Sequence, residues 1–436
     1  MVTPDWRHAE RDALVSFARN AITPTGFGYL DADGVHQDDH GVELWINGRF
    51  THVFACEVIR GNEGARDLLD HGMRALTHSL RDPRYDGWFA SVATGEGPDD
   101  VDANGHARPF TPDDTRKQAY SHAFVILAAA SALQAGHDQA RALFDDAVEL
   151  FDRYWWEGEV GRACESYPRD WSTCEAYRGI NANMHTTECF LAAFDATGER
   201  RYLERALGII RFAMSQAADN DHRIPEHYTA EWIQDPDYNR DKPADPFRPW
   251  GATVGHAFEW ARLALQAGIV AHREGFVDLA GEQGEWLVTE PLRLIAQAEA
   301  DGWHADGADG FVYTTDFKGT PITHERMHWV VCEAINAVHV ARRALDELTA
   351  AGIANPEWAH VSLSDYETKE NRWWDYAREY LLAAPGRWRE ELDRHNQLSE
   401  KTWRGMPEIY HAYQALVLPD GDFAPGFAKA AASPAS

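Results

Sequence analysis

Six histidines recur at nearly even intervals along this 436-residue chain, and this recurrence constrains the fold more than any other feature. Each lies in the early turns of an alanine- and aromatic-rich segment with helical periodicity. Neighbouring members are 63 to 83 residues apart. A repeat of that size is two helices and a long loop, a unit that must pack against its neighbours to bury its apolar face. The six are His52, His122, His185, His256, His328 and His411.

Helical periodicity covers most of the chain and predicts twelve helices that pair into six hairpins, with a histidine helix second in each pair. We predict an all-α fold, a closed (α/α)6 barrel, whose histidine helices form the inner ring and bring their histidines to one end of the cavity. An open solenoid is the alternative, but its units are shorter, at roughly 34–47 residues. The predicted helices are 6–22, 47–60, 64–82, 114–135, 138–156, 181–196, 199–217, 252–268, 274–300, 325–348, 365–383 and 406–417.

Long connecting segments precede the histidine helices, whereas the loops that follow these helices are short. Four of the long segments are rich in Gly, Pro, Asp and aromatic residues: 83–113, 157–180, 218–249 and 302–324. Loops of that length in a compact domain are usually functional, so we expect them to wall a pocket. We predict one catalytic domain over residues 1–420 and a flexible, low-complexity tail over 421–436.

The charge balance excludes some classes of partner. The chain has 41 Lys+Arg against 70 Asp+Glu, a formal charge of −29, which opposes binding to nucleic acid or anionic membranes. It has no apolar run that could span a bilayer, and its start lacks the pattern of a signal peptide. Five cysteines without CxxC spacing are typical of reduced thiols. We expect a cytoplasmic protein, monomeric or a small homo-oligomer, that binds a neutral small molecule.

One stretch, residues 248–263, combines a Pro/Gly loop with the start of a helix. His256 and Glu259 are three residues apart and therefore share a helix face. An imidazole beside a carboxylate can exchange protons near neutral pH. The sequence has no HExxH motif, EF-hand loop, tight His/Cys cluster, phosphate loop or Rossmann fingerprint, so we predict neither a metal nor a cofactor.

Histidines without a metal, in an aromatic-lined pocket, favour proton transfer on a sugar. That reaction needs a base beside the reacting carbon and a second group for the oxygen, and His256 and His411 are the candidates. Glycoside hydrolysis is an alternative that requires paired carboxylates. A carbohydrate-binding protein without catalysis is a third. The carboxylates available for hydrolysis are Glu188, Glu259, Glu333 and Asp316.

Several motifs together resemble the N-acylglucosamine 2-epimerase superfamily over nearly the whole chain. They are Arg49 ahead of the first histidine, Asn181-x-x-x-His185, His256-x-x-Glu259 and Tyr410-His411. Five segments look most like the aldose–ketose isomerase branch: 88–91, 119–124, 313–317, 326–329 and 405–411.

The resemblance implies interconversion of mannose and fructose, with lyxose and xylulose as a further pair, through ring opening and a cis-enediol without metal or cofactor. It implies that His411 moves the proton between C2 and C1, and that His256 is the second acid/base, held by Glu259. His185 would assist ring opening. The implied substrate-binding residues are Arg49, Trp45, Tyr120, Asn181, Trp329 and Trp403.

Within the same superfamily, a sugar 2-epimerase and a sulfoquinovose isomerase are the alternatives. The sulfonate enzyme needs cationic and amide contacts, and Glu391 stands where it would have a glutamine. A carboxylate there would repel a sulfonate and accept hydrogen bonds from a sugar hydroxyl, which indicates a neutral hexose. Arg248, a cation, is the residue that would instead favour an anionic substrate.

Overall fold

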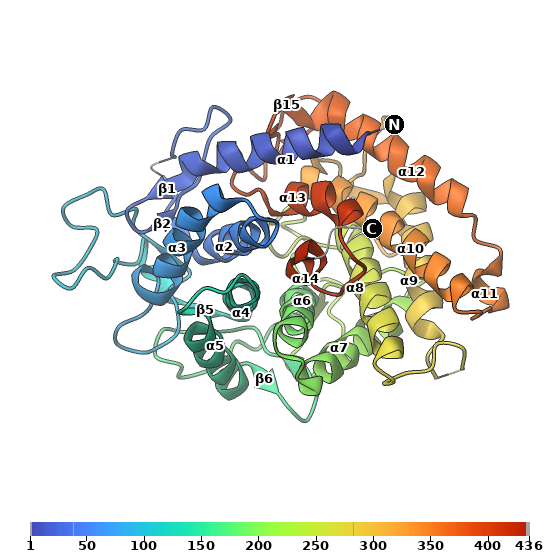
Figure 1. The fold of residues 1–436 in the computed structure, drawn as a ribbon, viewed down its shortest axis with the longest axis horizontal. Coiled ribbons are helices and arrows are strands. Elements are labelled where there is room, and N and C mark those ends of the chain that lie inside the picture. Colours follow the sequence, from blue (N-terminus) through green and yellow to red (C-terminus); the bar gives the residue numbers. More distant parts are fainter. Residues whose placement is uncertain (1, 38, 282, 433–436) are drawn as a thin grey trace.

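The computed structural model describes residues 2–37, 39–281 and 283–432. Two concentric layers of helices form a closed ring, as Figure 1 shows. The inner layer is α2 (Leu44–Ile59), α4 (Ala119–Gln134), α6 (Ile180–Thr197), α8 (Val254–Arg273), α10 (His328–Ala350) and α13 (Tyr410–Val417). The outer layer is α1 (Pro4–Ala18), α3 (Arg66–Arg74), α5 (Ala140–Tyr154), α7 (Arg200–Ala218), α9 (Trp286–Gly302) and α12 (Leu363–Tyr376). Helix α13 contacts both α10 and α2, which closes the ring and confirms the predicted (α/α)6 barrel.

The inner helices are buried on nearly all sides, whereas the outer helices bury one face. Helix α4 is built from Ala, Val, Ile, Leu and Phe, which suits a position between two layers. Gly48 of α2 lets that helix approach α4 closely, because a Cβ atom there would lie 2.5 Å from the Phe124 side chain. Among the described helices, none is both long and apolar enough to cross a membrane.

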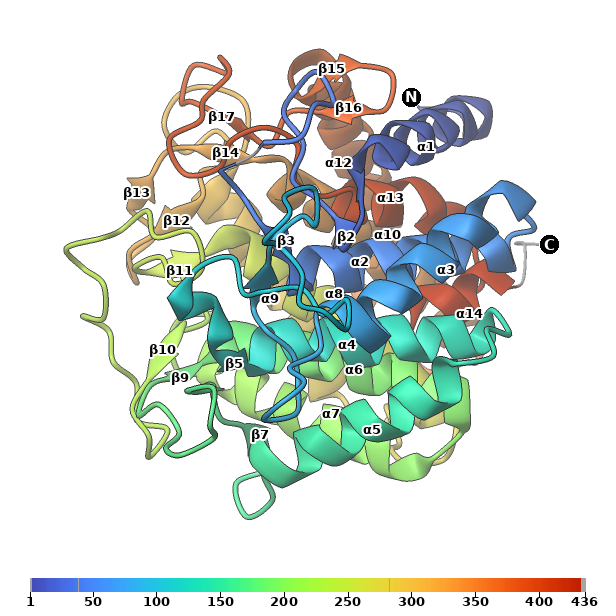
Figure 2. The same cartoon turned by 90° about the vertical axis from the view of Figure 1, so that its left-hand side faces the viewer.

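Short antiparallel strands join the long loops at one end of the barrel (Figure 2). Many of these pairs include the residues just before an inner helix, so the strand pairing fixes where five of the six inner helices begin. The pairs at inner-helix starts are β3 (Val42–Glu43) with β4 (Ser91–Val92), β5 (Lys117–Gln118) with β8 (Ser166–Tyr167), β9 (Arg178–Gly179) with β10 (His227–Tyr228), β11 (Ala252–Thr253) with β12 (Thr314–Thr315) and β13 (Pro321–Thr323), and β14 (Arg326–Met327) with β17 (Glu391–Leu392). Elsewhere β1 (Ile22–Thr23) pairs β2 (Gly26–Phe27), β6 (Trp156–Glu157) pairs β7 (Arg162–Ala163), and β15 (Leu382–Ala384) pairs β16 (Arg387–Trp388).

Two predicted helices have different bounds in the structure. Residues 274–285 were expected to begin a helix, but α9 starts at Trp286. Gly275, Gly281 and Gly284 interrupt this stretch, and Gly275 has a φ of +72°, which ends α8. The range 365–383 ends as a helix earlier than predicted, because α12 passes into a π-helical turn over Ala377–Leu381 and then into β15. A short helix, α11 (Pro356–Ala359), precedes α12.

The expectation of a flexible tail from residue 421 differs from the structure. Residues Phe427–Ala432 form helix α14, with Phe427, Ala428, Ala430 and Ala431 buried. This helix packs against α2, α4 and α6 at the end of the barrel opposite the strands (Figures 1 and 2). Its small apolar side chains fill the opening between the inner helices, which a composition-based interpretation of the tail does not reveal. Residues 433–436 lie outside the described part of the chain.

Candidate active site

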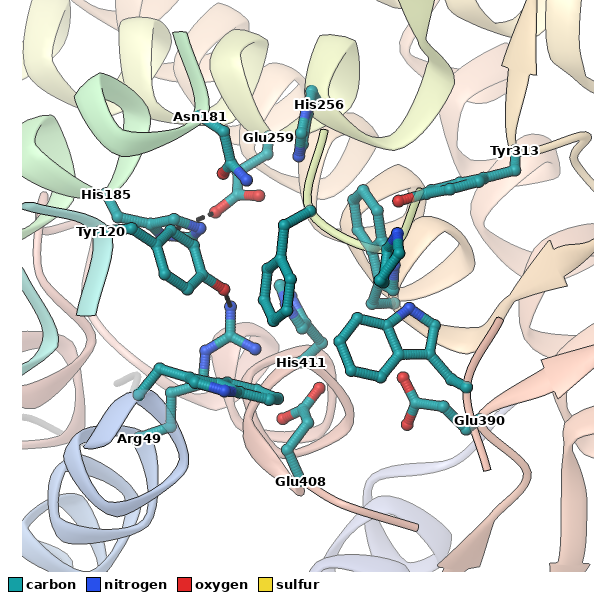
Figure 3. Close-up of a pocket in the computed structure, with 15 residues that line it drawn as sticks. Arg49, Tyr120, Asn181, His185, His256, Glu259, Tyr313, Glu390, Glu408 and His411 are labelled. Atoms are coloured by element: carbon teal, nitrogen blue, oxygen red, sulfur yellow. Dashed lines mark hydrogen bonds and ion pairs between the residues drawn. The ribbon is translucent and has the colours of Figure 1, made fainter. Parts of the chain in front are cut away.

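The inner helices all begin at the strand-covered end, and their first turns surround a small enclosed pocket of about 60 Å³. Figure 3 shows these side chains pointing toward one another. The inner helices supply Trp45, Arg49, Tyr120, Asn181, His185, His256, Glu259, Trp329 and His411. The long loops supply Pro246, Phe247, Tyr313, Glu390, Trp403 and Glu408. The pocket thus gathers residues from most of the length of the sequence.

His256 is held by a carboxylate that the sequence did not indicate. Its Nδ1 lies 3.0 Å from each oxygen of Glu226, in the loop before β10, and both residues are buried. Glu259 does not hold His256 as predicted, because that carboxylate points instead toward Arg262 and His185. A buried carboxylate accepts, so Nδ1 carries the proton and Nε2 is left as the basic nitrogen.

His411 has the same arrangement on the other side of Trp329. Its Nδ1 donates to Oε1 of Glu333 at 3.2 Å. The His256 and His411 rings lie 5.3 and 5.7 Å from the Trp329 ring, so the two imidazoles share one small pocket. Gly255 permits this approach, because a Cβ atom there would lie 2.2 Å from the Trp329 ring.

His185 forms a third histidine–glutamate pair, with Nδ1 3.2 Å from Oε2 of Glu188. Burial lowers the pKa of His185 to about 4, although the Glu188 carboxylate opposes that shift. His185 is therefore neutral near pH 7. The hydroxyl of Tyr410 donates to the other oxygen of Glu188, which fixes that carboxylate beside the pocket.

Three carboxylates beneath the pocket share one guanidinium. Arg262 of α8 is fully buried, and its Nε donates to Glu333 at 2.8 Å. One of its terminal nitrogens lies 3.5 Å from Glu259 and 3.8 Å from Glu188. Burial, together with the neighbouring Glu333 charge, raises the pKa of Glu259 well above its ordinary value. Burial therefore favours the protonated form of Glu259, which lines the pocket.

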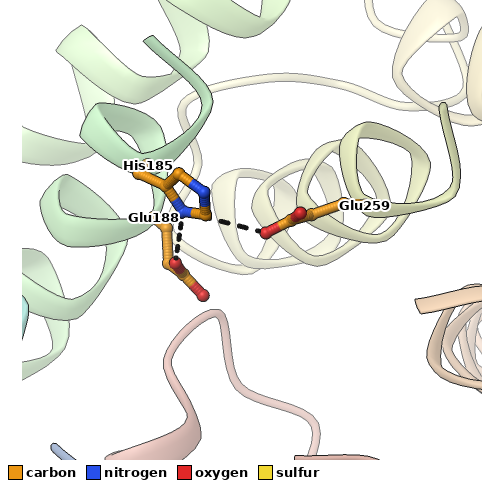
Figure 4. Close-up of side chains that lie close together, drawn as sticks. All are labelled: His185, Glu188 and Glu259. Carbon is orange, nitrogen blue, oxygen red and sulfur yellow. Dashed lines mark hydrogen bonds and ion pairs between the residues drawn. The ribbon is translucent and has the colours of Figure 1, made fainter. Parts of the chain in front are cut away.

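His185, Glu188 and Glu259 lie close enough to be considered as metal ligands (Figure 4). Their ligand atoms are within 4.8 Å of one another. Arg262, however, already places a positive charge against both carboxylates. A dication at this position would have to compete with that guanidinium.

The other three histidines of the repeat do not line the pocket, which corrects the prediction that all six converge there. His52 Nδ1 lies 2.7 Å from Ser131 Oγ, and His122 Nε2 lies 2.8 Å from the Ala147 carbonyl. Burial lowers the pKa of His52 to about 4 and that of His122 to about 3. Both are neutral residues of the core that fasten one helix to the next.

His328 is different, because it lies between two carboxylates of the pocket wall. Its Nδ1 is 3.3 Å from Glu390 and its Nε2 is 3.4 Å from Glu408. Burial alone would lower its pKa, but the two carboxylates outweigh burial and raise the pKa of His328 to about 10. His328 is therefore a buried cation between the two carboxylates, and the pKa of Glu408 is lowered to about 2.

Arg49 is a fixed cation of the pocket. Its guanidinium packs against the rings of Trp45, Phe124 and Tyr410 at 4.5 to 5.0 Å, and one terminal nitrogen donates to the Tyr120 hydroxyl at 3.5 Å. Its buried Nε has no hydrogen-bond partner among the described residues, and neither does Oδ1 of Asn181. Both residues line the pocket.

Two predicted substrate-binding residues lie outside the pocket. Glu391 accepts hydrogen bonds from the backbone amides of residues 401–403 at 2.9 to 3.1 Å and so shapes the Trp403 loop. Neighbouring strand residues point in opposite directions, so Glu390 faces the pocket in its place. Arg248 pairs with Glu175 at 2.8 Å in an adjoining outer cavity.

Of the carboxylates considered for hydrolysis, one lies far from the pocket lining. Asp316 accepts from the amides of Lys318 and Thr320 and forms a turn. Glu188 and Glu333 each serve a histidine, as described above.

Sequence reasoning missed several residues that face or support the pocket. Glu226, Phe247, Tyr313 and Glu408 come from loops, and Glu390 differs by one position from the predicted Glu391. Glu226 and Phe247 lie in the long segment 218–249 that was expected to wall a pocket, and Tyr313 and Glu408 lie in the motifs 313–317 and 405–411.

A closed helical barrel with three histidine–glutamate pairs at one pocket is the framework of an enzyme that moves protons. The comparisons agree: residues 26–415 match the N-acylglucosamine 2-epimerase (GlcNAc 2-epimerase) family. The chain belongs to that family, and it is an aldose–ketose isomerase.

The chain is similar to characterised relatives over almost its full length. It is 44% identical to a D-mannose isomerase of Thermobifida fusca, over 98% of this chain and 97% of the relative. It is 38% identical to a D-mannose isomerase of Pseudomonas cannabina pv. alisalensis, over 98% and 95%. A crystal structure of D-mannose isomerase superposes with a TM-score of 0.78 at 25% identity, covering 95% of this chain and 97% of that one.

Proposed function

We propose that the protein interconverts D-mannose and D-fructose by proton transfer between C2 and C1 through a cis-enediol. The observation that carries this proposal is that His256 and His411 face one pocket, each with Nδ1 hydrogen-bonded to its own carboxylate. That pairing leaves Nε2 of each imidazole free to exchange a proton with the same sugar. The similarity to D-mannose isomerases supports the choice of substrate.

In the proposed reaction, the open-chain aldose lies with C1 and C2 between the two imidazoles. Nε2 of His411 takes the proton from C2, and the electron pair forms the C1–C2 double bond of the enediol as the protonated Nε2 of His256 gives its proton to the carbonyl oxygen O1. The same nitrogen then returns a proton to C1, while the O2 hydroxyl loses its proton to His256 and becomes the ketone. Glu226 and Glu333 stabilise whichever imidazole is positively charged.

Neighbouring groups handle the sugar oxygens. Arg49, with its unpartnered donor, is placed to stabilise negative charge on O1 or O2 in the enediol. Glu259, held protonated, is the acid that we propose for opening the sugar ring, with His185 assisting. Asn181 is proposed to bind a hydroxyl through its free carbonyl oxygen.

We further propose a neutral substrate. Glu390 and Glu408 both line the pocket, and both are at most 7% exposed. They suit the hydroxyls of a neutral hexose, whereas a sulfonate or phosphate would be repelled. The proposed preference for mannose over sulfoquinovose therefore rests on a different residue from the one expected, Glu390 in place of Glu391.

Entry of the sugar requires the pocket to open. A cavity of about 60 Å³ holds only a few water molecules, and a hexose is larger. Phe247 and Trp403 pack edge to face at 5.3 Å across the pocket. Phe247 also borders the outer cavity of about 530 Å³, so its movement would join the two spaces.

Deuterium labelling tests the proposal. Mannose incubated with the protein in deuterated water is expected to give fructose carrying deuterium at C1, detected by NMR. A 2-epimerase would instead label C2 of a new aldose, and a hydride shift would leave the fructose unlabelled. Release of reducing sugar from an oligosaccharide would indicate hydrolysis, and binding without conversion would indicate a carbohydrate-binding protein.

We also propose that the reaction needs no metal and that the protein acts in the cytoplasm. The five cysteines are unpaired, as a reducing compartment would keep them. Dialysis against a chelator is expected to leave the rate unchanged, and a rate restored only by added dication would contradict the proposal.

A further inference from the structure

The C-terminal segment 421–432 lies at the opposite end of the barrel from the pocket, yet one chain of contacts connects the two. Figure 1 shows α14 inside the ring of inner helices, and it contacts α2, α4 and α6. Gln266 of α8 donates to the Ala424 carbonyl at 2.9 Å. The Gly426 amide donates to Asp195 at 2.8 Å, and Lys429 pairs with the same carboxylate at 3.1 Å. The segment is therefore fastened across the barrel.

Successive turns of α8 lead from the pocket to this segment. His256 and Glu259 line the pocket, Arg262 lies one turn deeper, and Gln266 contacts the segment itself. At a rise of 1.5 Å per residue, the ten residues from His256 to Gln266 span about 15 Å. Only one layer of charged side chains thus separates the pocket from the C-terminal segment.

Phe427 makes the contact that connects them. Its buried ring lies 5.2 Å from the Arg262 guanidinium, within the range of a cation–π interaction. Arg262 in turn donates to Glu333, which orients His411, and approaches Glu259. The Phe427 ring therefore covers Arg262, the cation that lies against the carboxylates beneath the pocket.

We propose that segment 421–432 is a plug that positions the active site, with Phe427 seating Arg262 beneath Glu259 and Glu333. Phe427 is a positioning residue, since it does not line the pocket. Without the ring, water would reach Arg262 from the far end of the barrel. Hydration would weaken the attraction between Arg262 and Glu333 and would loosen the hydrogen bond that orients His411.

Loss of the Phe427 ring, and the water that would then enter, would also affect Glu259. Burial is the largest reason that its pKa is raised, so entry of water would lower that pKa toward its ordinary value. Because Glu259 is the proposed acid for ring opening, the basic limb of the pH–rate profile should then move to lower pH. If α14 only stabilised the fold, the basic limb of the pH–rate profile would not move. The pH–rate profile therefore distinguishes a positioning role from a purely structural one.

The test compares Phe427→Ala with Phe423→Ala. Phe423 belongs to the same segment, but its ring lies against Arg273 and Arg343 on the outer surface, at 5.5 and 5.7 Å. For Phe427→Ala we expect kcat for mannose to fall about tenfold with KM changed less than about twofold, because the catalytic groups are displaced while sugar binding is kept. The basic limb of the pH–rate profile of Phe427→Ala should shift down by about half a pH unit or more. Phe423→Ala should behave as the wild-type protein in both respects.

The inference depends on the proposed function, and a second readout keeps the two separable. Hydrogen–deuterium exchange of the α8 peptide around Arg262 should be faster in Phe427→Ala than in the wild type or in Phe423→Ala. Wild-type protein that fails to convert mannose would refute the proposed function, while unchanged exchange in Phe427→Ala would refute the plug.

Three results would overturn the inference: a wild-type pH profile in Phe427→Ala, an equal shift in Phe423→Ala, or unchanged exchange. Should the alanine variant not fold, Phe427→Leu applies the same test. Leucine keeps an apolar side chain but lacks the ring, so a smaller shift in the same direction is expected, and an unchanged profile would again refute the plug.

Discussion

Replacing Glu226 by glutamine tests the pairing of histidine with carboxylate most directly. Both oxygens of Glu226 lie 3.0 Å from Nδ1 of His256, and one also accepts from the Thr253 amide at 3.3 Å. Glutamine keeps the size but removes the charge. Its NH₂ group can also donate to Nδ1, which would place the ring proton on Nε2, the nitrogen that must receive one from the sugar.

The size of the effect follows from the charge that is lost. Two unit charges about 4 Å apart attract by about 4 kcal/mol at an effective dielectric constant of about 20. The amide retains a neutral hydrogen bond of about 1 kcal/mol, so the charged imidazole loses about 3 kcal/mol of stabilisation. At about 1.4 kcal/mol per factor of ten, kcat should fall by about 10²-fold. KM should change little, because Glu226 does not line the pocket.

Steady-state conversion of mannose to fructose measures this loss, and the chain offers a matched control. Glu370 lies 3.2 Å from Nδ1 of His339, a similar pair that does not line the pocket. Glu370→Gln should leave kcat unchanged, and Glu226→Asp should lose less than Glu226→Gln because it keeps the charge. A Glu226→Gln enzyme within about twofold of the wild type, or an equal loss in Glu370→Gln, would refute the role given to Glu226.

Further predictions concern the acidic wall, the entrance and the buried cation. Glu390→Gln should raise kcat/KM for hexose 6-phosphates relative to mannose, by about tenfold for one charge removed, and an unchanged ratio would contradict the assigned selectivity. Phe247→Ala should lower the barrier to sugar entry and raise the association rate measured by stopped-flow fluorescence; an unchanged rate would show that the ring does not limit entry. Because the pKa of His328 is raised from 6.5 to about 10, its stabilising contribution is complete below about pH 6.5 and is lost as pH rises through about 10. Urea unfolding should therefore show a steeper loss of stability between pH 7 and 10 in the wild type than in His328→Asn, and parallel curves would contradict this.

The fold could be predicted because its main constraint is periodic. Histidines such as His122 and His256 mark inner helices, and the alanine-rich pattern around them predicts burial on all sides. Breaks in the pattern were harder to place. Gly281 and Gly284 end the helical pattern before α9, and the short apolar α14 resembles a low-complexity tail until the barrel opening that it fills is known.

The site could be predicted where its residues lie on helices, and poorly where they lie on loops. Helical spacing placed His185 and His256 on the inner face, and the structure brings both to the pocket. Glu226 is 30 residues from His256 in the sequence, so only tertiary structure brings the two together. At Glu390 and Glu391 the error is a single residue, which in a strand reverses the direction of the side chain.

An acidic protein must still stabilise the negative charge that develops on an enediol, and the barrel itself supplies part of the answer. The six inner helices begin at the pocket, at Leu44, Ala119, Ile180, Val254, His328 and Tyr410. Each helix N-terminus carries roughly half a positive charge from its aligned peptide groups. Directed into a pocket screened from bulk water, these partial charges add to Arg49 and oppose the field of Glu390 and Glu408. The closed ring of parallel inner helices thus explains how a chain with a net charge of −29 can bind a neutral sugar through carboxylates and still stabilise an anionic intermediate.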